Sequence, residues 1–255
     1  MTYVDDPLKE YLAILRNWYT EGLKIEDTEE LYRFFKRYRE YFPQTNGKDF
    51  YRFMQKLSPG EGSRFLSQSQ FKSKRWLTEA LIECGERSLG VTFILGGWYG
   101  LLGHFLLYDN RLRFNQIFSF DIDERSSQLA DVLNNDGRID HWRFKAVTKD
   151  ILNLNYLNSS FLVHDKNMRE IQISIAPETI INTSCEHIDL DRWWGLVPKG
   201  KRVVLQSNDM FDEPDHVSCF HTLGEFKNAL KIGRICYEGE TSIGRYKRFM
   251  IIGYK

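Results

Sequence analysis

The chain has 255 residues, of which 42% are hydrophobic and 27% are charged, and its formal net charge is zero. This length suits one α/β domain with an extra subdomain, and the composition is that of an ordinary globular protein. Zero net charge gives no overall attraction to nucleic acid or anionic membranes, and no apolar run approaches the roughly 20 residues of a membrane helix. Four separated cysteines and no secretion signal lead us to expect a cytoplasmic location, with no C-x-x-C zinc motif.

Residues 1–88 have the apolar periodicity of helices. The spacing predicts helices over about 8–19, 27–42, 49–57 and 69–86. We interpret this region as an N-terminal helical cap that packs on the main domain. The alternative, a lid or substrate wall, is compatible with that interpretation.

From residue 89 to residue 255, short apolar runs alternate with helical stretches. This alternation predicts a three-layer α/β domain with a mostly parallel sheet covered on both faces. The last two runs are joined by a short turn and predict an antiparallel hairpin, which the ordinary dinucleotide-binding fold lacks. The expected strands cover residues 91–95, 117–120, 143–147, 178–182, 202–206, 234–240 and 246–253.

A glycine-rich turn follows the first expected strand directly, in the sequence GGWYGLLG over residues 96–103. Such strand-to-helix turns, at the carboxyl edge of a parallel sheet, are where these folds bind ligands. Glycine lets the backbone turn sharply and approach a ligand, and the helix expected over 101–108 presents its amino end there. The G-x-G-x-x-G dinucleotide fingerprint is absent from this window. A purely structural turn is the alternative.

Two carboxylates follow the next strands. Asp121 ends the second strand, about one βα unit beyond the glycines, where a carboxylate can accept hydrogen bonds from both ribose hydroxyls. A helix N-cap is the alternative there, although Asp123 suits that role better. Asp150 follows the third strand and would face the adenine end; a capping or loop aspartate is equally compatible.

The order of glycine turn, two acidic positions and terminal hairpin resembles the class I, Rossmann-like S-adenosylmethionine-dependent methyltransferases over residues 89–255. The resemblance implies S-adenosyl-L-methionine as cofactor. It implies that the glycine turn lines the methionine and ribose region, that Asp121 holds the ribose, and that Asp150 lies near the adenine amino group. Bulky Trp98 and Tyr99 depart from the small residues usual in that turn. The full set of expected cofactor-binding residues is Gly96, Gly97, Trp98, Tyr99, Gly100, Asp121, Ile122, Asp150, Ile151, Asn182 and Thr183.

A polar segment after the fourth strand is the candidate catalytic site, because small-molecule methyltransferases of this class have a similar Glu-His-Ile segment there. We nominate His187 as the general base, since an imidazole can accept the proton of an acceptor group near neutral pH. Glu186 would orient it or bind a substrate amine; capping and local packing are the alternative for both residues. Asn182 and Ser184 could bond the methionine amino group or the substrate, whereas no pattern supports Cys185 as a nucleophile.

Further features leave alternatives open. Residues 206–216 predict either a substrate-recognition loop or an ordinary polar loop, and their Asp212, Asp215 and His216 make no complete metal-ligand set, so no metal is expected.

Trp193 and Trp194 are expected to pack a helix against the sheet, with a substrate wall as the alternative. The basic run at Lys72, Lys74 and Arg75 is interpreted as a solvated helix face.

We therefore expect an enzyme that methylates an oxygen or nitrogen of a small molecule or a terminal group. A nucleic acid acceptor is disfavoured by the balanced charge. The alternatives are transfer of the cofactor's aminocarboxypropyl group, as in nicotianamine synthases, and a non-catalytic cofactor-binding module. A nicotinamide oxidoreductase is disfavoured by the glycine spacing. The sequence makes no prediction of oligomeric state.

Overall fold

The computed structural model describes residues 47–58, 61, 64–65, 67–135, 142–165 and 169–255. The helices expected over 8–19 and 27–42 lie outside these residues. The short helix expected over 49–57 is found as α3 (Gly47–Met54), and the one expected over 69–86 is found as α5 (Gln68–Glu83). In the described part of the chain, no helix is both long and apolar enough to cross a membrane.

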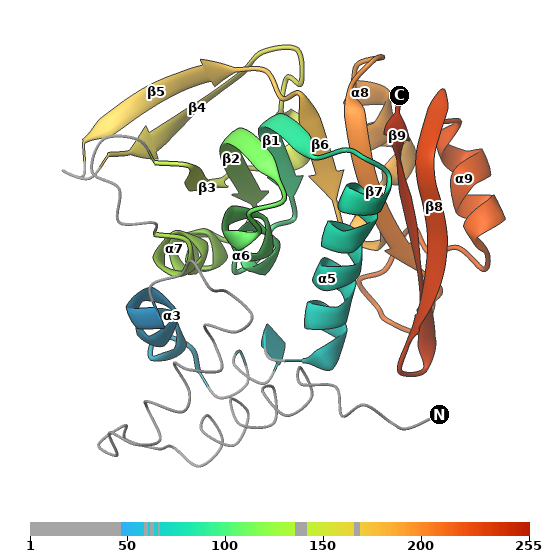
Figure 1. Ribbon diagram of the computed structural model, residues 1–255, viewed down its shortest axis with the longest axis horizontal. Coiled ribbons are helices and arrows are strands. Elements are labelled where there is room, and N and C mark those ends of the chain that lie inside the picture. The colour runs from blue at the N-terminus through green and yellow to red at the C-terminus, as the bar shows by residue number, and fades with distance from the viewer. Residues whose placement is uncertain (1–46, 59–60, 62–63, 66, 136–141, 166–168) are drawn as a thin grey trace.

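The centre of the molecule is a seven-stranded sheet with the strand order β3-β2-β1-β6-β7-β9-β8. The first five strands in this order are parallel, whereas β9 runs antiparallel to both β7 and β8. The expected parallel sheet with a terminal hairpin is therefore confirmed (Figure 1). The strands are β1 (Ser88–Leu95), β2 (Arg113–Asp121), β3 (Phe144–Thr148), β6 (Thr179–Asn182), β7 (Arg202–Asn208), β8 (Arg234–Ile243) and β9 (Tyr246–Tyr254).

Side chains alternate between two cores along the buried strands, because successive residues of a strand point to opposite faces. In β1, Phe93 and Leu95 join one core, and Ile94 joins the other. Each side chain of this size contributes about 1.5–3 kcal/mol when it is fully buried. The sheet therefore needs covering layers on both faces, which is the expected three-layer arrangement.

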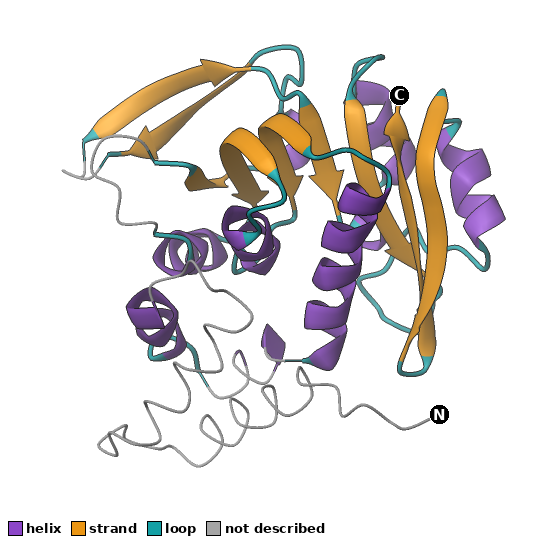
Figure 2. Cartoon of the chain, viewed as in Figure 1, coloured by secondary structure: helices purple, strands orange, loops and turns teal. Residues whose placement is uncertain are grey.

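The two covering layers can be followed in Figure 2. One face is packed by apolar side chains of α5, α6 (Leu101–Tyr108) and α7 (Glu124–Leu133). The other is packed by α8 (Leu190–Leu196) and α9 (Leu223–Leu230). Since α5 shares its core with the sheet, this part of the first 88 residues packs as one body with the main domain.

A second, two-stranded sheet was not expected from the sequence. It pairs β4 (Ser159–His164) with β5 (Glu170–Ile175) in antiparallel register, between β3 and β6 in the chain. Phe161 of β4 anchors it, because its ring lies 5.0 Å from that of Phe118 and 5.2 Å from that of Phe120. The hairpin thus extends the core on one face of the main sheet.

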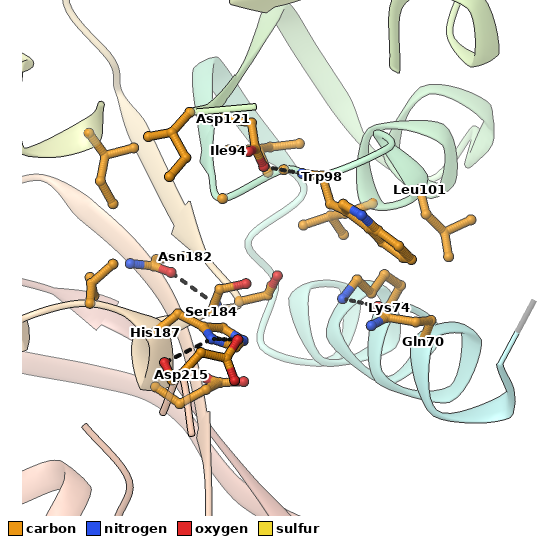
Figure 3. Close-up of a pocket in the computed structure, with 18 of the residues that line it drawn as sticks. Gln70, Lys74, Ile94, Trp98, Leu101, Asp121, Asn182, Ser184, His187 and Asp215 are labelled. Carbon is orange, nitrogen blue, oxygen red and sulfur yellow. Dashed lines mark hydrogen bonds and ion pairs between the residues drawn. The ribbon is translucent and has the colours of Figure 1, made fainter. Parts of the chain in front are cut away.

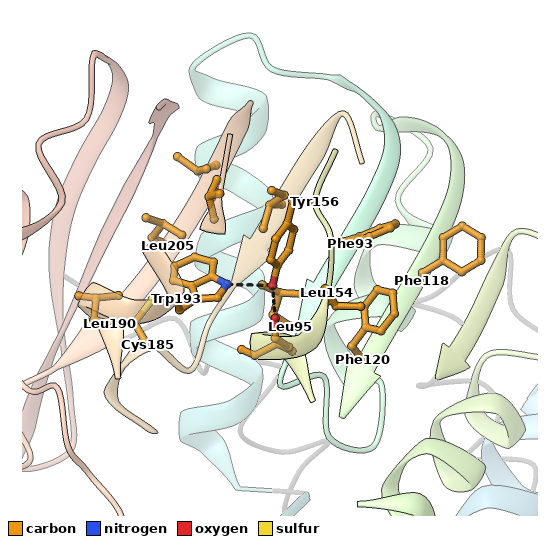
Figure 4. Close-up of a cluster of buried hydrophobic side chains, with 14 of the residues drawn as sticks. Phe93, Leu95, Phe118, Phe120, Leu154, Tyr156, Cys185, Leu190, Trp193 and Leu205 are labelled. Carbon is orange, nitrogen blue, oxygen red and sulfur yellow. Dashed lines mark hydrogen bonds between the residues drawn. The ribbon is translucent and has the colours of Figure 1, made fainter. Parts of the chain in front are cut away.

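Trp193 packs α8 against the same face of the sheet, as the sequence predicts. It is fully buried, and its indole N–H donates to the hydroxyl of Tyr156 over 2.9 Å (Figure 4). Tyr156 in turn donates to the main-chain oxygen of Ile151, over 2.9 Å. This chain of bonds ties α8 to the turn that follows β3.

Candidate functional site

A cavity of about 840 Å³ lies at the carboxyl edge of the parallel strands (Figure 3). The register brings Leu95 of β1 level with Phe120 of β2 and with Asn182 of β6, so residues distant in the sequence meet at this edge. The lining residues come mainly from the ends of β1, β2 and β6 and the segments that follow them, the turn after β3, helices α5 and α6, the loop after β7, and β9. Nine of the eleven expected cofactor-binding residues, and both expected catalytic residues, line this cavity.

The glycine turn has the close packing that its sequence predicts. A Cβ atom on Gly97 would lie 1.9 Å from the Oγ of Ser119, so any other residue at that position would force the side chain of Ser119 to move. Gly96 and Gly100 have φ angles of 61° and 76°, in the left-handed region where glycine is favoured. Trp98 also has a positive φ, of 47°, which costs free energy for a residue with a side chain.

Asp121 stabilises this turn. Its Oδ2 accepts a hydrogen bond from the backbone N–H of Trp98 over 2.8 Å, and its Oδ1 accepts one from Asp123 over 3.1 Å. The carboxylate keeps further lone pairs beside the cavity that it lines. The N-cap role belongs to Asp123, whose side chain accepts from the backbone of Ser126 at the start of α7, as expected.

The two rings inside the turn have different surroundings. Trp98 and Tyr99 stack with their centroids 4.2 Å apart, but only Trp98 lines the cavity. Tyr99 is buried in an aromatic cluster with Phe53 and Phe65, and its hydroxyl donates to Glu61 over 3.1 Å. Gly100 is the N-cap of α6 and is also absent from the cavity lining. Tyr99 and Gly100 therefore contribute to the packing of the turn and do not line the cavity.

Asp150 is a helix cap that also lines the cavity. Its Oδ1 accepts from the backbone N–H of Leu152 over 2.9 Å, so it caps the short 3-10 helix Ile151–Asn153. Asp150, Ile151 and Leu152 also line the cavity. Ile122, directly after β2, lines the same cavity with 76% of its surface exposed and offers an apolar surface.

Asn182 has an unsatisfied donor at the end of β6. Its Oδ1 accepts from the backbone N–H of Ser184 over 3.0 Å, which fixes the amide orientation. Its Nδ2 is buried and has no hydrogen-bond partner among the described residues. An unpaired buried donor costs about 1–3 kcal/mol, so Asn182 is suited to bind an acceptor atom of a ligand.

Glu186 and His187 point to different partners. Glu186 is buried, and its Oε1 accepts from Arg248 over 2.7 Å and from Asn208 over 2.8 Å. His187 is partly exposed, and its Nδ1 lies 3.2 Å from a carboxylate oxygen of Asp215. The carboxylate that orients His187 is therefore that of Asp215, from the loop after β7, and Glu186 is held by Arg248.

Two basic residues of the cavity were missed by the sequence analysis. Lys74 is only 9% exposed, so the interpretation of its basic run as a solvated face is wrong at this position. Burial, with a smaller effect of Arg248, lowers the pKa of Lys74 to about 7. Its spacing from Phe71 and Leu77 places Lys74 on the apolar face of α5, and this spacing was the available signal. Arg248 lies in β9, where no local pattern distinguishes it.

Comparisons with known proteins bear on the fold. No family model and no curated protein sequence matches the chain. The structure is similar to the magnesium protoporphyrin IX methyltransferase of Synechocystis PCC 6803 with bound SAH (TM-score 0.50, 12% identity, 96% of this chain and 99% of that chain). It is also similar to the N-methyltransferase NodS of Bradyrhizobium japonicum WM9 with S-adenosyl-L-homocysteine (TM-score 0.50, 11% identity, 80% of this chain and 98% of that chain). The chain thus has the class I S-adenosylmethionine-dependent methyltransferase fold.

Proposed function

We propose that the protein is an S-adenosyl-L-methionine-dependent methyltransferase that acts on an oxygen or nitrogen of a small molecule or a terminal group. The observation that carries this proposal is the cavity at the glycine turn, where the Asp121 carboxylate accepts a hydrogen bond from the backbone N–H of Trp98 at the carboxyl edge of a methyltransferase fold. The solved structures that resemble the chain include methyltransferases with S-adenosylhomocysteine bound.

The residues of the cavity fit this cofactor. Asp121 would accept hydrogen bonds from the ribose hydroxyls, as a carboxylate at this position can. Ile122 and Ile151 would pack against the adenine, with Asp150 near its amino group. The unpaired Nδ2 of Asn182 would donate to an oxygen of the methionine portion. The lining residues Gly96, Gly97, Trp98 and Thr183 would complete the methionine side of the site.

When bound, the cofactor supplies an electrophilic methyl group. The chain must then align the acceptor, exclude water from it and remove its proton where it has one. His187 lies on the cavity wall, and its Nδ1 lies 3.2 Å from the exposed carboxylate of Asp215. The second ring nitrogen of His187 is the group that we propose receives the proton. Glu186 accepts a hydrogen bond from Arg248 and holds its guanidinium in place.

We propose a small molecule or a terminal group as the acceptor and not a nucleic acid, since the cavity is lined by side chains of both charge signs. Lys74, Arg248, Asp189 and Asp215 all line it, so no single-sign surface for a phosphate backbone is present among the described lining residues. All four cysteines are free thiols, which fits the reducing cytoplasm that we propose as its location.

Product analysis tests this reaction. The full-length protein is incubated with S-adenosyl-L-methionine and a pool of low-molecular-mass metabolites, and the nucleoside product is identified by mass spectrometry. We expect S-adenosylhomocysteine together with an acceptor heavier by one methyl group, and much less of both with Asp121→Ala. Methylthioadenosine as product would contradict methyl transfer and support transfer of the aminocarboxypropyl group.

A further inference from the structure

Three side chains that can ligate a metal ion meet beside the cavity. Glu186 and His187 belong to the 3-10 helix Cys185–His187, and His216 comes from the loop after β7. One ligand atom of each lies within 4.8 Å of those of the other two. The rings of His187 and His216 are almost perpendicular, with centroids 4.6 Å apart.

Hydrogen bonds at the Nδ1 atoms fix the protonation pattern of both histidines. The Nδ1 of His216 lies 2.8 Å from the main-chain oxygen of Met210. The Nδ1 of His187 lies 3.2 Å from a carboxylate oxygen of Asp215 and 3.3 Å from the main-chain oxygen of that residue. Because these oxygens only accept, each neutral ring carries its proton on Nδ1 and presents a lone pair on Nε2. Metal-binding histidines are commonly held in this way.

Glu186 adds an unpaired oxygen. Its Oε1 is used by Arg248 and Asn208, but its Oε2 is buried and has no hydrogen-bond partner among the described residues. A carboxylate oxygen without a donor is costly in a buried position. One nitrogen of each histidine and one carboxylate oxygen of Glu186 lie within 4.8 Å of one another, so a cation placed among them is within reach of all three residues.

We propose that Glu186, His187 and His216 bind a divalent transition-metal ion, with Zn²⁺ as the preferred species. Two imidazoles and one carboxylate form a known ligand set of catalytic zinc sites, which keep a further position open. The carboxylate of Asp215 adds negative charge beside His187, whereas the guanidinium of Arg248 neutralises part of the charge of Glu186. Cys219 lies near His216, but its thiol donates to Asn208 and Met210 and stands outside the set.

The open position of such an ion would face the cavity, since both Glu186 and His187 line it. An acceptor hydroxyl or amine bound there would lose its proton more readily, as metal-bound water does. That use of the ion rests on the proposed methyl transfer, and it would replace His187 as proton acceptor. The binding of the ion itself is independent of the reaction.

Calorimetric titration of the chelator-treated, full-length protein with ZnCl₂ tests the site in the absence of S-adenosylmethionine. We expect one ion per chain, and we expect His216→Ala and His187→Ala each to weaken binding by at least about tenfold. His221→Ala is the matched control, because His221 lies in the same loop but stacks on Phe211 outside the cluster; its binding should equal that of the wild type. Circular dichroism checks that each variant folds.

Absence of stoichiometric binding in the wild type would overturn the proposal, as would binding that His216→Ala leaves unchanged. A parallel titration with S-adenosylmethionine on the metal-free protein keeps the two proposals apart. Cofactor binding without zinc binding refutes the metal site alone, and zinc binding without cofactor binding refutes the methyltransferase proposal alone.

Discussion

At the scale of single residues, the site depends on close packing in the glycine turn and on the hydrogen bonds of two strand-end residues. Gly97 has no space for a methyl group, Asp121 bonds two backbone N–H groups, and Asn182 keeps a free donor. The sequence identified all three because they follow strand ends, where a parallel sheet gathers its polar side chains. Their individual contacts depend on the register of β1, β2 and β6, which no local pattern specifies.

Gly97→Ala tests the close packing of the turn. The new Cβ would meet the Oγ of Ser119 at 1.9 Å, so we expect a loss of about 1–3 kcal/mol in the free energy of unfolding, measured with urea. Ser119→Ala in the same chain should recover most of this loss, because the remaining contact would be 3.2 Å, to the Cβ of Ser119. Gly195→Ala, which meets nothing within 4 Å, is the control. Equal stability of Gly97→Ala and the wild type would refute the packing argument.

His104 on α6 predicts a specific pH dependence. Burial lowers the pKa of His104 from 6.5 to about 3, although hydrogen bonds to Asn134 and Leu133 oppose this shift. Above pH 6.5 the residue is neutral in both states, so its contribution is constant. Below pH 6.5 only the unfolded chain takes up the proton, and stability falls until the pH reaches about 3.

Urea unfolding of the wild type and His104→Gln from pH 7.5 to 4.5 measures this effect. Titration of the carboxylates is common to both proteins and cancels in the difference. We expect the wild type to lose up to about 1.4 kcal/mol per pH unit relative to the variant in the acidic part of the range. Parallel pH curves would show that His104 is protonated in the folded protein.

At the scale of elements, the sequence predicted most of the sheet and missed one hairpin. The strands of the main sheet are apolar runs bounded by turn residues, which makes them visible. Strands β4 and β5 have alternating or largely exposed residues, such as Leu162 beside buried Phe161. The hairpin is held by the packing of Phe161 against rings of the main sheet, which no local pattern in the sequence shows. Arg248 escaped notice for the same reason, because its surroundings are set by tertiary packing, whereas the helical spacing of Lys74 from Phe71 and Leu77 was a signal in the sequence.

Phe161→Ala tests whether the hairpin belongs to the core. The ring packs against those of Phe93, Phe118 and Phe120, so we expect a loss of about 3–5 kcal/mol in the free energy of unfolding. Leu162→Ala, one residue along the same strand and 54% exposed, should stay within about 0.5 kcal/mol of the wild type. Similar losses in the two variants would contradict the assignment of Phe161 to the core.

At the scale of the whole molecule, the fold brings together groups that lie far apart in the chain. Helix α5, the glycine turn, the end of β6 and the loop after β7 supply Lys74, Trp98, Asn182 and Asp215 to one cavity. The parallel strands direct their carboxyl ends to this edge, and the antiparallel β9 adds Arg248 beneath it. The sequence predicted the edge and its strand-end residues, whereas the pairing of His187 with Asp215 required the path of a loop 28 residues further on.

Binding of S-adenosyl-L-methionine, measured by calorimetry on the full-length protein, tests the central proposal most directly. We predict one molecule bound per chain, and binding about 10–100-fold weaker for Asp121→Ala, because a charged hydrogen-bond acceptor contributes about 1.5–3 kcal/mol. Asp191→Ala, at an exposed position in α8, should bind as the wild type does. A wild-type protein that binds neither S-adenosylmethionine nor S-adenosylhomocysteine would contradict the proposed function.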